Sequence, residues 1–424
     1  MVQQVNPPRG MRDFLPGDKR HRDLVIDTIA RTYRQHGFES IETPVMEDHS
    51  TLHSGLGGDN EKLSFQILKR GLSPDDISAA SSTDDLSDLG LRFDLTVPLA
   101  RYVASHHQDL PPVFRALHIG PVWRAERPQK GRFRQFVQCD IDIVGEWGAL
   151  AEREVLLATS DALSALGVTN YRFRVNDRRL LHAVLNKAGV AEDAQMSVLV
   201  TLDKLDKIGR QGVLDELEAK HPEGVDRGVI GDVLSAVETG DIALDASVIT
   251  ALMGDDEAAA SLVEWASDLQ RLLGPDKVVF DPTLVRGMGY YTGSIVELEH
   301  PELGVSLGGG GRYDGMVGRF LGKDMPAFGF SLGFERLMDV LDATTVTDST
   351  RVALIYSADT DIAALLGLKA SLIADGKSVR LVSATRNMKA IFERLDAEGF
   401  AAVAQVDGEV PQADAVEWRE LGQR

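Results

Sequence analysis

The sequence predicts an α+β protein with more than one domain. A chain of 424 residues is longer than one ordinary hydrophobic core supports, so two or three domains are expected. Helix-like segments separated by polar breaks fill about residues 176–274, which indicates a helical insertion. Residues 351–424 instead alternate strand and helix, as in a small βαβ unit. These changes in the pattern of helices and strands predict a larger domain over 1–343, a polar linker over 344–350 and a C-terminal α/β domain over 351–424.

The first elements follow from hydrophobic spacing. Residues 18–36 carry one apolar helical stripe, formed by Val25, Ile29 and Tyr33. Gly37 suits the residue after a helix end, and residues 37–47 read as a strand that closes at a proline turn. Residues 71–90 are rich in Ser, Asp and Gly and predict a mobile loop.

The later elements of the larger domain follow in the same way. Residues 91–104 predict a strand that runs into a helix, and residues 148–166 predict a helix. Strands are expected at 171–175 and again from 277 to about 299.

Charge and composition exclude several classes of protein. The net charge of −20 argues against indiscriminate nucleic-acid binding, because such affinity comes from neutralising phosphates. The single cysteine excludes an intrachain disulfide and a cysteine-based zinc site, and the histidines show no metal-ligand spacing. No apolar run is long enough for a transmembrane helix, and the N-terminus does not read as a signal peptide. We therefore expect a cytoplasmic protein with no membrane contact and no protein-bound metal.

One short segment is rich in cations although the chain as a whole is acidic. Residues 122–138 have strand-like ends around a loop that gathers the cations Arg124, Arg127, Lys130, Arg132 and Arg134. Guanidinium groups bind phosphate oxygens bidentately and stay charged, so this hairpin is a candidate phosphate site. The alternative is a solvated basic surface hairpin.

Three other segments share this pattern of glycine, arginine and aromatic residues. Residues 328–341 read as a glycine-rich strand that leads into a helix with Glu335 and Arg336. Residues 284–297 contain Arg286 and paired tyrosines, and residues 306–315 contain four consecutive glycines before Arg312-Tyr313-Asp314. The glycine run is not a P-loop, because no Gly-Lys-Ser/Thr follows; taken alone it also fits a flexible turn or bulge.

These segments resemble the class II aminoacyl-tRNA synthetases. The helix–strand–proline over 18–47 is similar to motif 1, the arginine hairpin to motif 2, and Gly333-Phe-Glu335-Arg336 to motif 3. The run from Glu126 to Phe136 and the two tyrosine segments resemble the histidyl-tRNA synthetase family. The resemblance covers about residues 8–340 and, more weakly, 351–424. It implies an antiparallel sheet flanked by helices, a C-terminal anticodon-binding domain, and a homodimer formed through residues 18–47.

The resemblance also implies substrates and site residues. ATP with Mg²⁺, L-histidine and tRNA(His) are the implied substrates, and Arg124 and Arg286 the implied catalytic residues beside the α-phosphate. Arg286 would take part of the role that a metal plays in sister enzymes. The implied ATP-binding residues are Arg124, Glu126, Arg132, Phe136 and Arg336. The implied histidine-binding residues are Asp94, Thr96, Gln138, Asp142, Tyr291 and Tyr313.

The chain departs from the family pattern at several points. Position 289 is glycine where the family often has aspartate, and position 142 is aspartate where many bacterial members have glutamate. The C-terminal part is shorter than the usual anticodon-binding domain. Asp94 could also be an ordinary helix cap. The competing function is a non-catalytic, histidine-sensing regulatory paralogue of ATP phosphoribosyltransferase, which characteristically loses the catalytic arginines and the anticodon domain.

Overall fold

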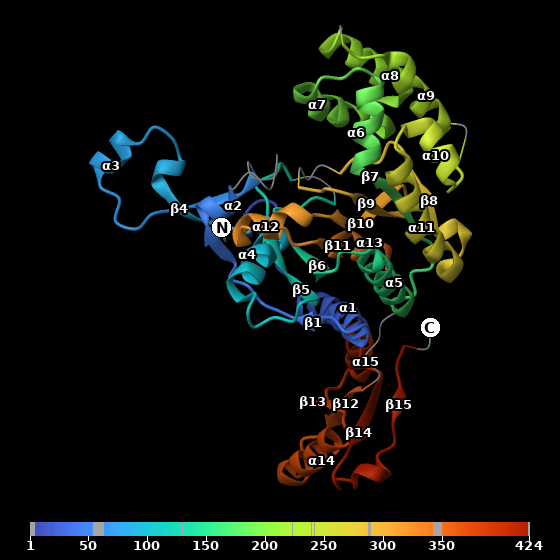
Figure 1. Ribbon diagram of the computed structural model, residues 1–424. Coiled ribbons are helices and arrows are strands. Elements are labelled where there is room, and N and C mark those ends of the chain that lie inside the picture. Colours follow the sequence, from blue (N-terminus) through green and yellow to red (C-terminus); the bar gives the residue numbers. More distant parts are fainter. Residues whose placement is uncertain are drawn as a thin grey trace. The chain divides into compact units, whose positions relative to one another are not determined.

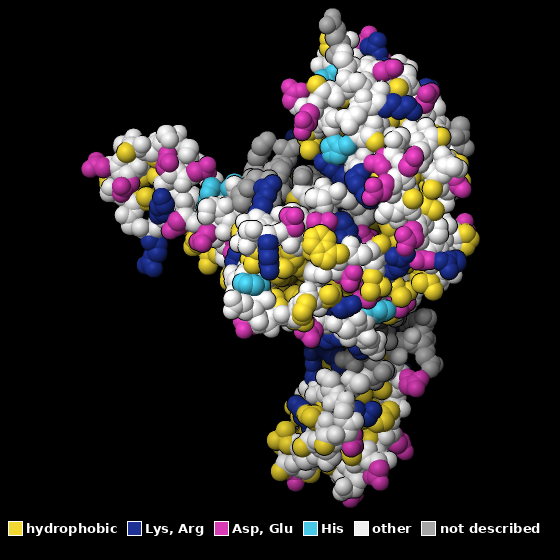
Figure 2. Space-filling view, viewed as in Figure 1, with side chains coloured by type: hydrophobic (Ala, Val, Ile, Leu, Met, Phe, Trp, Pro, Cys, Tyr) yellow, Lys and Arg dark blue, Asp and Glu magenta, His cyan; other side chains and the backbone are white. Residues whose placement is uncertain are grey.

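The computed structural model describes residues 5–53, 63–128, 131–222, 224–238, 240, 242–286, 290–341 and 350–422. It divides into two compact units, one formed by residues 1–12 with 28–341 and the other by 13–27 with 342–424. The expected linker over 344–350 lies outside the described residues except for Thr350. Charged side chains of both signs are intermixed on the face shown in Figure 2.

An eight-stranded sheet forms the centre of the larger unit, in the order β1-β5-β6-β11-β10-β9-β7-β8 (Figure 1). Its inner pairs are antiparallel, whereas β1 pairs with β5 and β8 with β7 in parallel, so the sheet is mixed. The strands are β1 (Glu39–Ser40), β5 (Phe114–Trp123), β6 (Gln135–Val144), β7 (Arg172–Asp177), β8 (Val278–Phe280), β9 (Ser294–His300), β10 (Val305–Arg312) and β11 (Ala327–Gly333). This agrees with the α+β class, with parallel pairs only at the two edges.

The apolar stripe predicted for the first helix is buried. Val25, Ile29 and Tyr33 of α1 are fully buried, and Gly37 has a positive φ of 83° after the helix end. Helix α5 packs against β6 and β11, and α4 packs against α12 (Figure 1). Helix α1 spans Pro16–Gln35, and the helices around the sheet are α4 (Thr96–His106), α5 (Leu150–Ala165), α12 (Asp314–Leu321) and α13 (Phe334–Val340).

The stretch between β7 and β8 is helical, as its texture predicts. Its helices are α6 (Arg178–Lys187), α7 (Glu192–Leu202), α8 (Leu205–Lys220), α9 (Arg227–Glu238), α10 (Ala246–Met253) and α11 (Asp256–Leu273). Helices α6 to α10 gather beyond the β7–β8 edge of the sheet, in green to yellow in Figure 1. Helix α11 returns along the sheet, where it packs against α5, and the short η3 (Pro275–Lys277) leads into β8.

Two expectations for the N-terminal part are wrong. Residues 37–47 do not form one strand: the chain pairs briefly as β1 and again as β2 (Met46–Asp48), which belongs to another sheet with order β2-β4-β3. Residues 71–90 are not an unstructured loop. They contain α3 (Pro74–Ala79), which begins at a capping box between Ser73 and Asp76, then η2 (Asp84–Leu86) and β4 (Ser87–Leu91). The remaining elements here are α2 (His49–Leu52) and β3 (Phe65–Leu68).

The C-terminal chain forms a sheet of its own with the order β13-β12-β14-β15, in which only β15 is antiparallel. Its elements are β12 (Arg351–Tyr356), α14 (Ile362–Ala374), β13 (Ser378–Ser383), α15 (Met388–Ala397), β14 (Ala402–Val406), η4 (Ala413–Ala415) and β15 (Arg419–Glu420). Leucines of α14 and α15 fill its two hydrophobic clusters. Among the described residues, we find no helix that is both long and apolar enough to span a membrane.

Candidate active site

A cavity of about 790 Å³ opens on one face of the central sheet of the larger unit. Every residue that the sequence singled out for ATP or histidine lines it: Asp94, Thr96, Arg124, Glu126, Arg132, Phe136, Gln138, Asp142, Arg286, Tyr291, Tyr313 and Arg336. The arginine hairpin is therefore part of a pocket and not merely a solvated surface. Position 289 and Lys130 lie outside the described residues.

Glycines of strands β10 and β11 line this cavity and add no side chains to it. The glycine run 308–311 lies in strand β10 and pairs with β11, so it is neither a turn nor a loop, although the register shifts at Ser306/Gly308. A β-carbon on Gly310 would lie 2.0 Å from the Gly329 carbonyl oxygen, and one on Gly329 would lie 1.7 Å from Asp142 Oδ1. Only residues without a side chain let these strands and the carboxylate approach so closely.

Carboxylates from two neighbouring segments form what we call the acidic part of the pocket: Asp94, Asp140 and Asp142. All are buried, with at most 3% of each side chain exposed. Burial raises the pKa of Asp94 to about 6 and that of Asp142 to about 7, because a charged carboxylate loses its hydration. The Tyr313 hydroxyl donates to Asp142 Oδ1 at 2.6 Å, which lowers the pKa of Asp142 in part.

The two carboxylate oxygens of Asp94 differ in their contacts. Its Oδ1 accepts a hydrogen bond from the Val97 backbone N–H, in the first turn of α4, at 3.1 Å, whereas the N-cap position itself is Leu95. Its Oδ2 is buried and has no hydrogen-bond partner among the described residues. Such an orphaned acceptor costs free energy unless a ligand donates to it.

The tyrosines form the wall beside these carboxylates. Tyr290 and Tyr291 meet edge to face at a centroid distance of 4.8 Å, and Tyr290 lies 6.0 Å from Tyr313. Burial raises the pKa of Tyr290, and a hydrogen bond with Thr96 opposes that rise. The sequence predicted Tyr291 as a site residue but not Tyr290, although the two are adjacent and both line the pocket.

We call Arg132, Arg286 and Arg336 the basic part of the pocket. Arg286 Nη1 donates to Glu297 Oε2 at 2.8 Å, and its guanidinium lies over the backbone of Gly309, where a β-carbon would be 2.5 Å away. Arg132 lies 3.6 Å from a Glu126 oxygen, and Arg336 donates to the Ser306 carbonyl at 2.8 Å. Burial, then the neighbouring Arg132, lowers the pKa of Arg336, as expected where cations crowd.

Arg124 also lines the pocket and interacts with the acidic part. Its Nε donates to the Phe93 carbonyl at 2.9 Å, and its guanidinium is 5.1 Å from the centre of the Phe136 ring. It also interacts electrostatically with Asp94 and Asp140, and it lowers the pKa of both. A single fixed cation thus faces both the carboxylates and the aromatic ring.

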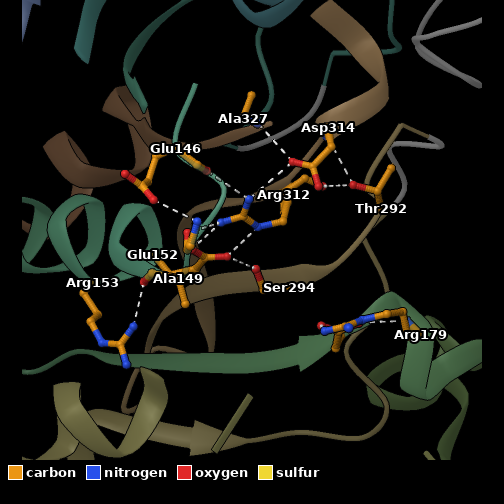
Figure 3. A network of polar contacts seen from close by, with 12 residues as sticks. Glu146, Ala149, Glu152, Arg153, Arg179, Thr292, Ser294, Arg312, Asp314 and Ala327 are labelled. Carbon is orange, nitrogen blue, oxygen red and sulfur yellow. Dashed lines mark hydrogen bonds and ion pairs between the residues drawn. The ribbon is translucent and has the colours of Figure 1, made fainter. Parts of the chain in front are cut away.

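Arg312, directly before Tyr313, does not line the pocket but stabilises the chain next to it. Figure 3 shows its guanidinium gripping the Glu152 carboxylate, with Nε–Oε1 at 2.8 Å and Nη2–Oε2 at 2.7 Å. Asp314 accepts from the Ala327 backbone at 3.0 Å, and Ser294 donates to Glu152 at 2.8 Å (Figure 3). This buried network joins α5 to the ends of β9, β10 and β11, and so fixes the backbone that carries Tyr313.

Two further pocket residues, Asp140 and Glu297, were not predicted from the sequence. Asp140 alternates with Gln138 and Asp142 along β6, so the period of a strand would have placed it on the same face. Glu297 reaches the pocket because β9 pairs with β10, where Glu297 lies opposite Gly309. No local signal in the sequence shows that pairing.

Known proteins resemble this chain over nearly its whole length. The family model for histidyl-tRNA synthetase matches residues 10–337. The histidine–tRNA ligase of Leifsonia xyli subsp. xyli is 51% identical over 421 residues, which covers 97% of each chain. The probable histidine–tRNA ligase of Tropheryma whipplei (strain Twist) is 41% identical over 415 residues, covering 95% of this chain and 96% of that one.

Solved structures agree with this result. The crystal structure of histidyl-tRNA synthetase from Nostoc sp. PCC 7120 is 28% identical, with a TM-score of 0.75, and covers 96% of this chain and 92% of that one. An ATP phosphoribosyltransferase regulatory subunit/histidyl-tRNA synthetase from Bacillus halodurans C also has a TM-score of 0.75. It covers 97% of this chain and 100% of that one but is 22% identical, so it shows the fold alone. With the fold, the family match and the relatives in agreement, this chain belongs to the histidyl-tRNA synthetase family.

Proposed function

We propose that this protein is a histidine–tRNA ligase, which activates L-histidine with ATP and transfers it to the 3′ end of tRNA(His). The observation that carries this proposal is the convergence of every predicted ATP and histidine residue on one cavity. The relatives named histidine–tRNA ligase support the same reaction. Two displacements make it up, and the first takes place in this cavity.

In the first displacement, a histidine carboxylate oxygen attacks the α-phosphorus of ATP. The bond from that phosphorus to the bridging oxygen breaks, and pyrophosphate leaves with the electron pair. We assign Arg124 and Arg286 to the α-phosphate, where fixed cations stabilise the charge that develops on its oxygens. The contact of Arg286 with Glu297 at 2.8 Å supports this role, because it keeps the guanidinium in place before ATP arrives.

The remaining arginines and Phe136 suit the rest of ATP. We assign the adenine face to Phe136, the adenine amine to Glu126, and the outer phosphates to Arg132 and Arg336. Mg²⁺ would be bound with the phosphates. The carboxylate of Glu335, also in the cavity lining, is an oxygen donor of the kind that Mg²⁺ prefers, and the ion would neutralise phosphate charge there.

The acidic part of the pocket suits histidine. Asp94, Thr96 and Gln138 are assigned to the ammonium and carboxylate groups, and Asp142 to a ring N–H. Tyr291 and Tyr313 would line the imidazole site, and the bond from Tyr313 to Asp142 holds that carboxylate toward it. A site built around buried carboxylates rejects apolar amino acids of similar size, because the carboxylates would stay unpaired.

In the second displacement, a terminal ribose hydroxyl of tRNA(His) attacks the acyl carbon and AMP leaves. We propose that the domain over 351–424 binds the anticodon stem–loop. Its net charge is only −2, compared with −20 for the whole chain, so a local basic path there is compatible with RNA. We also propose a homodimer formed through residues 18–47 and a cytoplasmic location.

The regulatory paralogue is the competing proposal, and the arginines oppose it. Arg124, Arg132, Arg286 and Arg336 all line the cavity, and the chain carries a C-terminal unit. A protein that only senses histidine has no need of cations placed for phosphates.

Histidine-dependent exchange of pyrophosphate into ATP tests the catalytic proposal, with the other amino acids as controls. We expect exchange with histidine only. Exchange with a different amino acid would contradict the substrate, and exchange with none would favour the regulatory paralogue. Light scattering tests the dimer separately, since a particle near 46 kDa at micromolar concentration would be a monomer.

A further inference from the structure

Asp140 lies in the middle of β6, and none of the assignments to ATP or histidine uses it. It is 3% exposed and lines the cavity together with Gln138 and Asp142. Its strand neighbours are His118 of β5 and Ser331 of β11. Burial, and then the charge of Asp142, raises the pKa of Asp140 well above its usual range. A carboxylate this costly to bury needs an explanation.

The contacts of Asp140 lead to Gln138. Gln138 Nε2 donates to Ser331 Oγ at 2.8 Å and lies 3.5 Å from both oxygens of Asp140. Because Ser331 accepts this bond, its own hydroxyl proton is available to Asp140, and a hydrogen bond between Ser331 and Asp140 lowers the pKa of that carboxylate. Asp140 thus accepts at the end of a short chain that begins at the Gln138 amide.

This chain decides which end of the Gln138 amide faces the cavity. Both Asp140 oxygens lie 3.5 Å from the amide nitrogen, and while Asp140 is ionised they can only accept. The side occupied by Asp140 and Ser331 then takes the amide nitrogen and leaves the carbonyl oxygen elsewhere. Gln138 Oε1 is buried without a hydrogen-bond partner among the described residues, and so is Asp94 Oδ2. Both side chains line the cavity, so two acceptors await a donor from a ligand.

We infer that Asp140 is a positioning residue that, through Ser331, holds the Gln138 carbonyl as an acceptor for the α-ammonium group of histidine. Asp140 itself does not touch the substrate. The inference rests on the proposed function, since it takes histidine as the ligand. The ammonium group would donate to Gln138 Oε1 and Asp94 Oδ2, the two buried oxygens without a partner among the described residues. Asp140 would orient Gln138, whereas Asp142 would accept from the imidazole ring.

Two analogues of histidine separate these tasks. Histidinol keeps the ring and the ammonium but lacks the carboxylate, whereas imidazolepropionate keeps the ring and the carboxylate but lacks the ammonium. Calorimetric titration gives the Kd of each for the parent protein, Asp140→Asn and Ser331→Ala. An asparagine can donate as well as accept, so Asp140→Asn removes the reason for one amide orientation over the other.

We expect Asp140→Asn to weaken histidinol binding by about 10- to 100-fold, the range for a lost bond to a charged group, and to change imidazolepropionate binding by less than about threefold. Ser331→Ala should shift the ratio of the two Kd values in the same direction by a smaller factor. In pyrophosphate exchange, the KM for histidine should rise while the KM for ATP stays constant.

A matched control removes a buried carboxylate outside the cavity lining. Glu47 is 7% exposed and pairs with Arg101, so Glu47→Gln tests the general effect of losing such a charge. A similar change in the Kd ratio for this control would overturn the inference, as would equal weakening of both analogues or no change in either. If Asp140→Asn does not fold, Ser331→Ala decides on the same ratio. Failure of the proposed function would look different, because the parent protein would then show no histidine-dependent pyrophosphate exchange, whichever analogue it binds.

Discussion

The pocket has two parts of opposite charge, and their side chains are prepared for ligands in different ways. The carboxylates of the acidic part are at most 3% exposed, and Asp94 and Gln138 keep buried acceptors without partners among the described residues. In the basic part, the side chains of Arg132 and Arg286 are 50% and 25% exposed and already paired with glutamates. A ligand must therefore complete the acidic part, whereas it needs only to displace or share contacts in the basic part.

This difference suggests a division of labour. An unpaired buried acceptor penalises the absence of the correct donor, so the acidic part should govern which amino acid binds. Cations held in place by glutamates are already oriented when charge develops on phosphate oxygens, so the basic part should govern the rate. Substitutions in the two parts should then separate KM for histidine from kcat.

The largest effect is expected from Arg286→His. Loss of a fixed cation at the α-phosphate should lower kcat for adenylate formation by on the order of 10²–10³, with little change in the KM for ATP. Steady-state pyrophosphate exchange measures both constants. Lys187→Gln, an exposed charge outside the cavity lining, is the control and should behave like the parent protein. An unchanged kcat would remove Arg286 from the catalytic residues.

Asp142→Asn should separate stability from function. The pKa of Asp142 is raised to about 7, so this group favours the folded state while protonated at low pH, and that contribution is lost as the pH rises through about 7. Asparagine still accepts from Tyr313 but never ionises. We expect the ligand-free variant to be more stable than the parent by about 2–4 kcal/mol at pH 8, and unable to activate histidine.

Thermal unfolding across pH checks this prediction. The difference between variant and parent should shrink as the pH falls from 7 toward 4, where the parent becomes protonated as well. A difference that is independent of pH would show that packing, and not ionisation of Asp142, sets the effect.

Two alanine substitutions in neighbouring strands should sharpen the comparison. A β-carbon at Gly329 would collide with Asp142, so Gly329→Ala should raise the KM for histidine by about 10- to 100-fold. A β-carbon at Gly309 would meet the Arg286 guanidinium, so Gly309→Ala should instead lower kcat by about tenfold or more. Gly315→Ala, which meets nothing within 4 Å, is the control. The same kinetic pattern for both variants would contradict two separate parts.

The smallest effect is expected in the C-terminal unit. Several of its cations already have partners: Arg380 and Arg394 pair with Glu398, and Lys389 with Glu393. Changing Lys377 and Arg386 to glutamine should raise the KM for tRNA a few-fold and reduce the salt dependence of tRNA binding by about one unit of slope per lost phosphate contact. Histidine-dependent exchange should stay constant. Equal loss of both activities would mean that the unit acts on stability alone.

The sequence predicted chemistry better than it predicted secondary structure at the N-terminus. The arginine hairpin and the tyrosine segments are local patterns, so their residues could be named before any pairing was known. The short helix α3 was missed because its weakly apolar sequence outweighed the Ser73–Asp76 capping box. Strand β1 is only two residues long because the chain soon leaves β5 to build another sheet. Glu297 and the ionic support around Arg312 depend on strand pairs distant in sequence, which no local window contains.

The order of strands in the central sheet also bears on synthesis. Strand β6 pairs on one side with β5, which precedes it directly, but on the other side with β11, where Val144 meets Ala327. At ribosomal rates of about 5–20 residues per second, the second partner emerges roughly 10–40 s later. During that interval β6 presents an open edge, which carries Cys139, Ile141 and Ile143 and could pair with other chains. Nascent chains that stall within the helical insertion should therefore aggregate unless a chaperone covers that edge.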